Sequence, residues 1–162
     1  MKNVKTFLFT IIGIFLLFSC SASAASTVTT SEIYSLANGD YLETILIQDS
    51  TSRATSSTKS GQKTTYYKSS SGVTLWSVTV KASFSYTYGK SSTCTSVTGS
   101  SASSSVAWKV SSASSKKNGN TATASATGYH YTNGALVESL SRSVSLSCDI
   151  YGCLLYTSDA AD

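Results

Sequence analysis

The sequence predicts an all-β protein, an immunoglobulin-like antiparallel β-sandwich of about seven or eight strands with its topology left open. The stretch from Gly72 to Cys94 alternates apolar and hydroxyl-bearing residues, which is the period of a strand with one buried face. The dipeptide Asn133-Gly134 is a strong hairpin signal. The 162 residues include no proline, and no segment of the mature chain has the period of an amphipathic helix.

The long alternating stretch is the central strand of this prediction. One parity carries large apolar side chains and the other carries Ser, Thr and Lys, so one face is expected on the core and the other in water. At about 3.3 Å per residue the stretch exceeds a typical strand, and a bend or bulge is predicted near residues 81–83. The residues expected to point inward are Thr74, Trp76, Val78, Val80, Ala82, Phe84, Tyr86 and Tyr88.

Residues 1–24 predict a secretory signal peptide. An apolar run from Phe7 to Phe18 follows a basic start, and Ala22-Ser23-Ala24 supplies a small-residue cleavage site. The expected location is therefore secreted or associated with the cell wall. In the alternative, residues 17–20 form a lipobox, and Cys20 becomes the lipidated N-terminus of an anchored lipoprotein.

The mature chain is expected to consist of a loose lead-in over residues 25–40 and one β-sandwich domain over residues 41–152. The turn signal Asn38-Gly39-Asp40 precedes the first strand, and polar connections cover residues 49–60 and 99–104. Strands are expected at residues 41–48, 62–68, 74–88, 92–98, 106–110, 121–131 and 135–148.

The segment from Cys153 to Asp162 resembles the translated sequence of a sequencing adapter. It is expected to be a non-native tail and is left out of the fold prediction, as an expression tag would be. The alternative is a natural polar tail.

Two cysteines remain once Cys20 is assigned to the signal peptide and Cys153 to the tail. Cys94 and Cys148 of an exported chain are expected to form a disulfide bond. A metal site is the weaker alternative, because zinc takes four such ligands and His130 is the only histidine. No metal and no cofactor are expected.

The order and rough spacing of Cys94, Trp108 and Cys148 are those of immunoglobulin domains, in which the tryptophan packs against the bridge. The match is partial. Leu146 stands where those domains carry a tyrosine, and little chain follows Cys148 to form a last strand. The prediction is therefore immunoglobulin-like in architecture only.

Five motifs are spread over most of the mature chain: Asn38-Gly39-Asp40-Tyr41-x-Glu43-Thr44, Thr93-Cys94-Thr95-Ser96, Trp108-Lys109-Val110, Gly119-Asn120-Thr121-Ala122 and Ser143-Val144-Ser145-Leu146-Ser147-Cys148. Together they resemble an uncharacterised family of small secreted β-sandwich proteins from Gram-positive gut bacteria. The resemblance implies export and a β-fold, and it supplies no activity and no site residue.

Charge is sparse, with 12 basic residues, 8 acidic residues and a net charge of +4. This balance is compatible with an anionic cell wall nearby, although many solvated surfaces share it. Lys116-Lys117 is too short a basic run to indicate nucleic acid as a partner. Contact with a membrane is expected only through the signal peptide, unless Cys20 is lipidated.

Catalytic residues are not predicted, and the protein is not expected to be an enzyme. An acid or base needs a partner that sets its pKa and its position. Asp40 and Glu43 lie at opposite parities where a strand begins, and Asp40 is expected to cap the turn. His130 lies beside the Asn133-Gly134 turn, where a solvated histidine is ordinary.

Glu138 and Arg142 stand out because both fall on the apolar parity of the last strand. Four residues along a strand span about 13 Å, too far for a direct ion pair. We expect these charges to protect a sheet edge against aggregation, with a ligand-binding pair as the alternative.

Four tyrosines provide the candidate binding platform: Tyr66, Tyr67, Tyr129 and Tyr131. Tyr129 and Tyr131 share a parity with Thr121 to Thr127, the expected solvent face, and one of the adjacent Tyr66 and Tyr67 must also point outward. Exposed rings on a rigid sheet stack against sugar faces or partner side chains. In the alternative, a bulge at Gly128 returns Tyr129 and Tyr131 to the core.

The expected function is that of a non-enzymatic, secreted or wall-associated β-sandwich that binds an extracellular glycan or protein partner. A small secreted effector, either a toxin or an inhibitor, is the alternative. A hydrolase is a weaker one, and it would need a pocket in which Glu43, His130 or Glu138 converge. Oligomeric state and ligand identity have no signal in the sequence.

Overall fold

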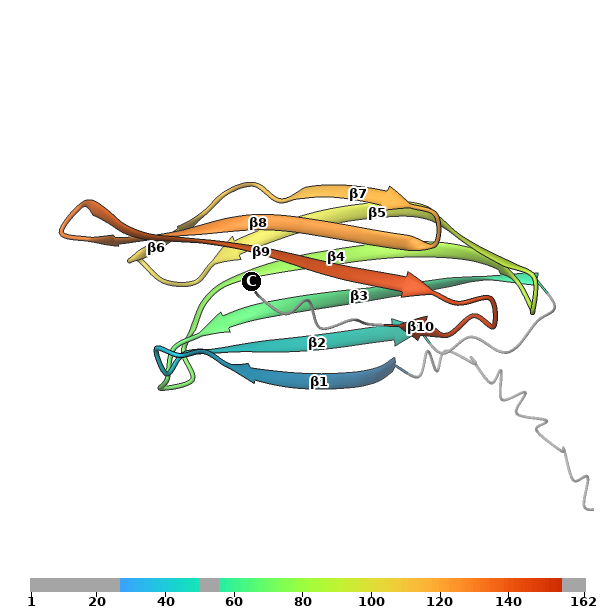
Figure 1. Cartoon of the computed structure of the whole chain (residues 1–162), viewed down its shortest axis with the longest axis horizontal. Helices are drawn as coiled ribbons and strands as arrows, with labels where there is room; N and C mark the ends of the chain where they lie inside the picture. The colour runs from blue at the N-terminus through green and yellow to red at the C-terminus, as the bar shows by residue number, and fades with distance from the viewer. Residues whose placement is uncertain (1–26, 50–55, 156–162) are drawn as a thin grey trace, which may run out of the picture.

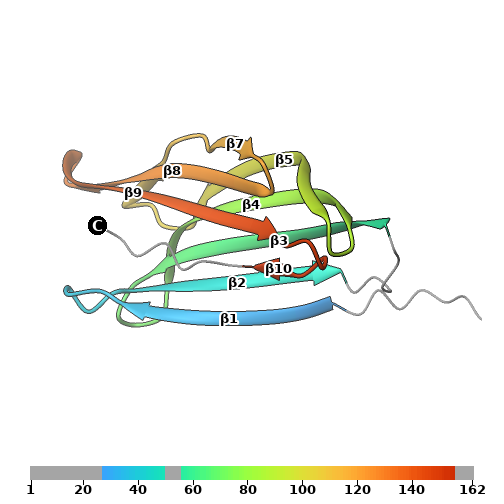
Figure 2. The same ribbon diagram turned by 45° about the vertical axis from the view of Figure 1, so that its right-hand side comes forward.

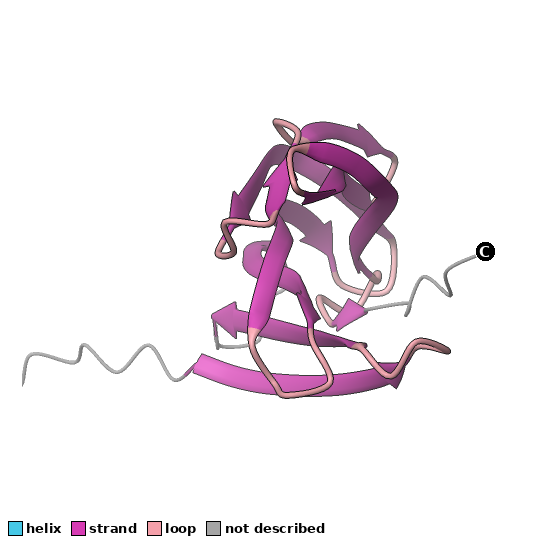
Figure 3. Ribbon diagram, turned by 90° about the vertical axis from the view of Figure 1, so that its left-hand side faces the viewer, coloured by secondary structure: helices cyan, strands magenta, loops and turns pink. Residues whose placement is uncertain are grey.

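The computed structural model describes residues 27–49 and 56–155, and the predicted signal peptide lies outside them. The described residues form strands and loops only, as Figure 3 shows, and no helix among them is long and apolar enough to cross a bilayer. The strands are β1 (Thr27–Ser35), β2 (Tyr41–Asp49), β3 (Ser56–Lys68), β4 (Thr74–Thr87), β5 (Ser91–Ser103), β6 (Trp108–Val110), β7 (Ser114–Asn118), β8 (Thr121–Thr132), β9 (Ala135–Cys148) and β10 (Leu154–Leu155).

Two open antiparallel sheets of five strands each make up the fold (Figure 1). The first sheet is a meander with the order β1-β2-β3-β4-β5, in which every strand pairs with the next one along the chain. The second has the order β10-β9-β8-β6, and β7 pairs with β8 beside β6. This confirms the all-β class and is consistent with a β-sandwich. The immunoglobulin-like topology is not shown.

The core lies between the sheets and follows the alternation of the central strand. From Trp76 to Tyr86, the apolar parity of β4 is buried and the hydroxyl parity is not. The second sheet contributes small residues opposite, Ala122 and Ala124 of β8 and Val144 and Leu146 of β9. The predicted face of β4 is therefore confirmed, except that Tyr88 lies in the turn after the strand and is exposed.

The predicted irregularity of the long strand is close to its observed position. Between β4 and β5 the register shifts after Ser83, so Ser83 faces Ser96 whereas Phe84 faces Cys94. Thr95 is the extra residue of this bulge. A bulge strengthens local twist, which lets a long strand bend around the core.

Several sequence-based boundaries differ from the structure. The connection expected at residues 49–60 is shorter, because β3 already begins at Ser56. The segment expected to be a loose lead-in forms β1, which pairs with β2 over its whole length. The connection expected at residues 99–104 belongs largely to β5, and β7 lies between residues 110 and 121, where no strand is expected. Hydroxyl-rich strands carry no alternation of apolar residues, so the sequence pattern does not identify them. They are identified in the structure by their backbone hydrogen bonds to neighbouring strands.

The last described strand lies beyond the predicted domain boundary at residue 152. Leu154 pairs with Cys148 and is buried, and Leu155 pairs with Ser147. The non-native origin of residues 153–162 stays a prediction, and residues 156–162 lie outside the described part.

The predicted disulfide is absent from the structure. Cys94, Cys148 and Cys153 are free thiols in the described part of the chain. Each of the two buried thiols donates instead to a nearby backbone carbonyl, Cys94 Sγ to Ser96 O at 3.3 Å and Cys148 Sγ to Asp149 O at 3.5 Å. Cys94, near the start of β5, and Cys148, at the end of β9, nevertheless lie beside the same turn, because their N–H groups donate to the adjacent carbonyls of Gly119 and Asn120.

Candidate functional site: a cleft and a tyrosine face

The β8–β9 hairpin and the β1–β2 turn lie at the same end of the molecule, on different sheets (left in Figure 1). Asn133 and Gly134 have φ of 52° and 80°, the left-handed values that a two-residue type I′ hairpin requires. This turn confirms the predicted hairpin. Along the hairpin β9 packs over β3, as Figure 2 shows, so its inner face looks toward the first sheet.

Alternate residues of this hairpin have different surroundings. Tyr129 opposes Lys109 and Ser139 on the outer face, whereas His130 opposes Trp108 and Glu138 on the inner face. The pairing shifts between His130 and Tyr131, after which Tyr131 opposes Leu136. The hairpin therefore presents tyrosines to one side and ionisable groups to the other.

The outer side forms a tyrosine face, which we define as Tyr129, Tyr131 and Lys109. Both tyrosines are half-buried, so the alternative that returns them to the core is not what the structure has. The Nζ atom of Lys109 lies 5.1 Å from the ring centroid of Tyr131, within cation–π range. Leu136 adds exposed apolar surface beside Tyr131.

The other two predicted platform tyrosines are not part of this face. Tyr67, expected as a platform residue, is instead a core residue with 1 % of its surface exposed, because it faces Trp76 on the inner side of the first sheet. Tyr66 points to the outer side of the first sheet, where its ring centroid lies 5.9 Å from the Nζ atom of Lys68. Tyr66 and the tyrosine face therefore lie on opposite outer faces of the sandwich.

A cleft of about 240 Å³ opens between the β1–β2 turn and the inner side of β9. Its lining combines apolar and polar residues from three separate parts of the chain. They are Leu36, Ala37, Asn38, Tyr67, Glu138, Leu140 and Arg142.

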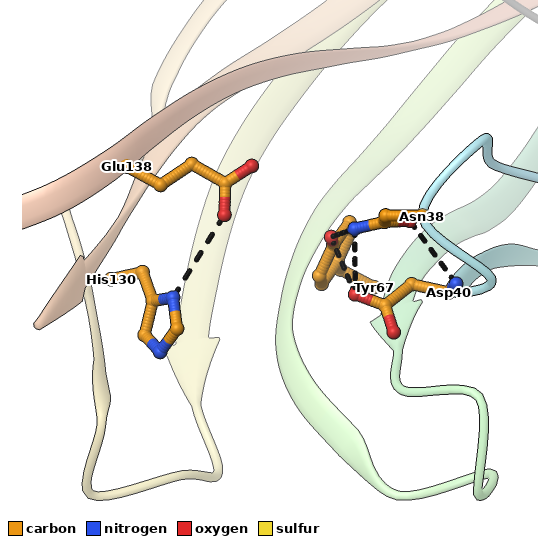
Figure 4. Close-up of polar contacts among 5 residues, drawn as sticks. All are labelled: Asn38, Asp40, Tyr67, His130 and Glu138. Carbon is orange, nitrogen blue, oxygen red and sulfur yellow. Dashed lines mark hydrogen bonds and ion pairs between the residues drawn. The ribbon is translucent and has the colours of Figure 1, made fainter. Parts of the chain in front are cut away.

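One wall of the cleft is held by hydrogen bonds (right in Figure 4). Tyr67 Oη donates to Asp40 Oδ2 at 2.8 Å, and Asn38 Nδ2 donates to both Asp40 Oδ2 and Tyr67 Oη at 3.1 and 3.2 Å. The other oxygen, Asp40 Oδ1, accepts from the backbone N–H of Ser70. Asp40 thus joins two turns, which extends the capping role predicted for it.

This network affects the phenol. Burial raises the pKa of Tyr67 to about 12, and the hydrogen bond to Asp40 together with the charges of Asp40 and Glu138 adds to the rise. The hydrogen bond from Asn38 acts in the opposite direction. Tyr67 is therefore a neutral hydrogen-bond donor across the physiological range, and this wall is structural.

The opposite wall is loosely held (left in Figure 4). Glu138 Oε2 lies 3.9 Å from His130 Nδ1, which is beyond hydrogen-bonding distance. Arg142 Nη1 donates to the backbone carbonyl of Ser141 at 2.9 Å, while its buried Nε has no partner. Glu138 and Arg142 thus line one cleft without forming an ion pair with each other, as their separation along β9 predicts.

A cluster of four aromatic rings joins residues of the two sheets beside the cleft. His130 stacks on Trp108, whose ring centroid is 5.2 Å from that of Tyr67 and 6.4 Å from that of Trp76. Tyr67 and Trp76 belong to the first sheet, and Trp108 and His130 belong to the second. His130 is consequently a packed residue rather than the freely solvated one expected from its position near a turn.

Of the three residues named for a hydrolase pocket, Glu138 and His130 are neighbours at 3.9 Å, and Glu43 is not near them. Glu43 lies on the outer face of the first sheet in an ion pair with Lys68, away from Glu138 and His130. Within residues 27–49 and 56–155, no group of three or more His, Cys, Asp and Glu residues could hold a metal ion.

No protein-family model, no curated protein and no solved structure matches the chain.

Proposed function

We propose that this protein is an exported, non-enzymatic β-sandwich that binds an extracellular glycan through its tyrosine face. The observation that carries the proposal is the pair of half-buried rings, Tyr129 and Tyr131, on one outer face of the second sheet. Residues two apart in a strand are about 6.6 Å apart, so the rings are positioned to contact neighbouring parts of one saccharide. Aromatic rings with a polar tip provide apolar area and hydrogen bonds together.

A hydroxyl track continues from the tyrosine face along the same outer surface. In three cross-strand pairs of β8 and β9, the two hydroxyl groups form a hydrogen bond of 2.7 to 3.0 Å. The pairs are Thr123 with Ser145, Ser125 with Ser143, and Thr127 with Ser141. A hydroxyl group has one donor and two acceptor sites, so each pair keeps capacity for a further partner. An extended glycan bound at the tyrosines would find this flat polar strip in line with it.

Export and an immunoglobulin-like arrangement belong to the same proposal. The pattern of residues 1–24 supports export. The inclusion of Cys94, Trp108 and Cys148 in one core cluster supports a relationship to immunoglobulin-like cores. Wall association is compatible with a net charge of +4.

Glycan-array binding by the chain from Ala25 onward tests the proposal. We expect binding to a restricted set of glycans, lost on Tyr129→Ala or Tyr131→Ala. Tyr66→Ala is the matched control, because Tyr66 is also an outer-face tyrosine beneath a lysine ammonium but lies on the opposite sheet. A uniformly negative array, or equal losses for Tyr66→Ala and Tyr129→Ala, would remove the glycan proposal and leave a protein partner to be tested on the same variants.

A further inference from the structure

The cleft contains two unlike charges that are not paired with each other. Glu138 has one ionic neighbour among the described residues, His130 at 3.9 Å, and it accepts no hydrogen bond there. The guanidinium of Arg142 has no anionic partner in the same part of the chain. Both side chains nevertheless line the same open cleft.

Arg142 is partly withdrawn from water, whereas 39 % of the Glu138 side chain is exposed. A shielded polar group without a partner loses its hydration without compensation, a cost of about 1–3 kcal/mol in protein interiors. Arg142 Nε is such a group, and the rest of its five-donor fork is used once, for the carbonyl of Ser141. The open wall therefore has unused capacity for one cationic and one anionic group.

The polar groups of the fixed wall are already engaged with one another. Asp40 already accepts from Tyr67, Asn38 and the N–H of Ser70. The phenol oxygen of Tyr67 both donates and accepts. A ligand would thus be selected by Glu138 and Arg142 and limited in shape by the rigid wall facing them.

We infer that the cleft binds a free α-amino acid, with its ammonium group at Glu138 and its carboxylate at Arg142. A guanidinium binds a carboxylate through paired N–H···O bonds, and a carboxylate accepts well from an ammonium group. The volume of about 240 Å³ lies below the range of pockets for drug-sized ligands, which suits a molecule of this size. Leu36, Ala37 and Leu140 provide apolar surface for a small aliphatic side chain.

This site is independent of the proposed glycan surface. Glu138 and Arg142 lie on the inner parity of β9, whereas the tyrosine face and the hydroxyl track lie on the outer side. Loss of glycan binding in Tyr129→Ala should leave amino-acid binding unchanged, and the converse should hold for Glu138→Gln.

The inference is tested by titrating the chain from Ala25 onward with the common L-amino acids. Binding is measured by calorimetry and by NMR. We expect small aliphatic amino acids to bind best. N-acetylalanine lacks the ammonium group and alaninamide lacks the carboxylate, so each should bind about tenfold or more weakly than alanine. Glu138→Gln and Arg142→Gln should weaken alanine binding to a similar extent, while Glu43→Gln and Lys81→Gln, on the outer face of the first sheet, should not.

Two results would overturn the inference. One is the absence of binding by every common amino acid at about 10 mM, where a site with a millimolar Kd is largely occupied. The other is equal binding of alanine and its two blocked derivatives, because the charges then contribute nothing. The blocked ligands are compared on the unsubstituted chain, so the test holds even if Arg142→Gln fails to fold.

Discussion

The imidazole of His130 lies flat against the indole of Trp108, with ring centroids 4.8 Å apart and an interplanar angle of 2°. The two residues face each other across the β6–β8 pairing. Through Trp108 the contact continues to Tyr67 and Trp76 of the first sheet. Both walls of the cleft therefore rest on one aromatic cluster, and the position of Glu138 relative to Asp40 depends on how these rings pack.

Removal of the central ring should destabilise the protein strongly. Trp108→Ala leaves a cavity between the sheets, and we expect the free energy of unfolding to fall by about 3–5 kcal/mol in guanidinium titrations. Val106→Ala is the control, since Val106 lies two residues away and is fully exposed. A loss below about 1 kcal/mol for Trp108→Ala would contradict its place in the core.

A methyl group at Gly128 should also be costly. It would lie 2.5 Å from Cε2 of Trp76, an atom of a rigid and fully buried ring. We expect Gly128→Ala to lower the unfolding free energy by about 1–3 kcal/mol through overpacking. At Gly61 a methyl group would also meet an atom at 2.5 Å, but this is the end of the flexible Leu154 side chain. Gly61→Ala should therefore cost less, and the reverse order in thermal unfolding would contradict this packing.

The parts of the fold that could be predicted are those where side chains carry a local signal. The period of two in β4 identifies the buried face of that strand. Asn133-Gly134 identifies the turn between β8 and β9, because both residues of such a turn must adopt positive φ. Glu138 and Arg142 were recognisable as unusual because they interrupt an apolar parity. In each case the physical constraint acts within a few residues.

The rest depends on pairing between distant segments. Parity requires one of Tyr66 and Tyr67 to point inward, but only the register with β4, in which Tyr67 faces Trp76, decides which. The cleft likewise needs the β1–β2 turn to approach β9 from the other sheet. In β1 the exposed residues Ile33 and Tyr34 are adjacent, so an edge strand shows no alternation.

Thiol labelling should distinguish the free cysteines of the structure from the disulfide expected from sequence. Burial raises the pKa of both Cys94 and Cys148, so few thiolates form and access is poor, whereas Cys153 is exposed. In the chain from Ala25 onward, iodoacetamide should modify Cys153 in the folded protein and all three cysteines after unfolding without reductant. If unfolding without reductant leaves Cys94 and Cys148 unlabelled, they are joined in a disulfide and the free thiols of the structure are contradicted.

Alkaline pH should destabilise the protein through Tyr67. Its folded-state pKa of about 12 exceeds the usual value of 10.0, so the folded protein binds more protons than the unfolded chain between these values. The contribution of the neutral phenol is complete below pH 10 and is lost as the pH rises toward 12. At about 1.4 kcal/mol per pKa unit, the loss amounts to roughly 3 kcal/mol.

Tyr67→Phe is the control that assigns this loss of stability at alkaline pH to Tyr67. It removes the titrating group and the hydrogen bond to Asp40, so the variant should be less stable at pH 8 by about 1–2 kcal/mol, yet its stability should fall less steeply above pH 10. Denaturant titrations of both proteins across this range provide the comparison. Parallel pH profiles would show that the pKa of Tyr67 is the same in the folded and the unfolded chain, and they would contradict the raised pKa.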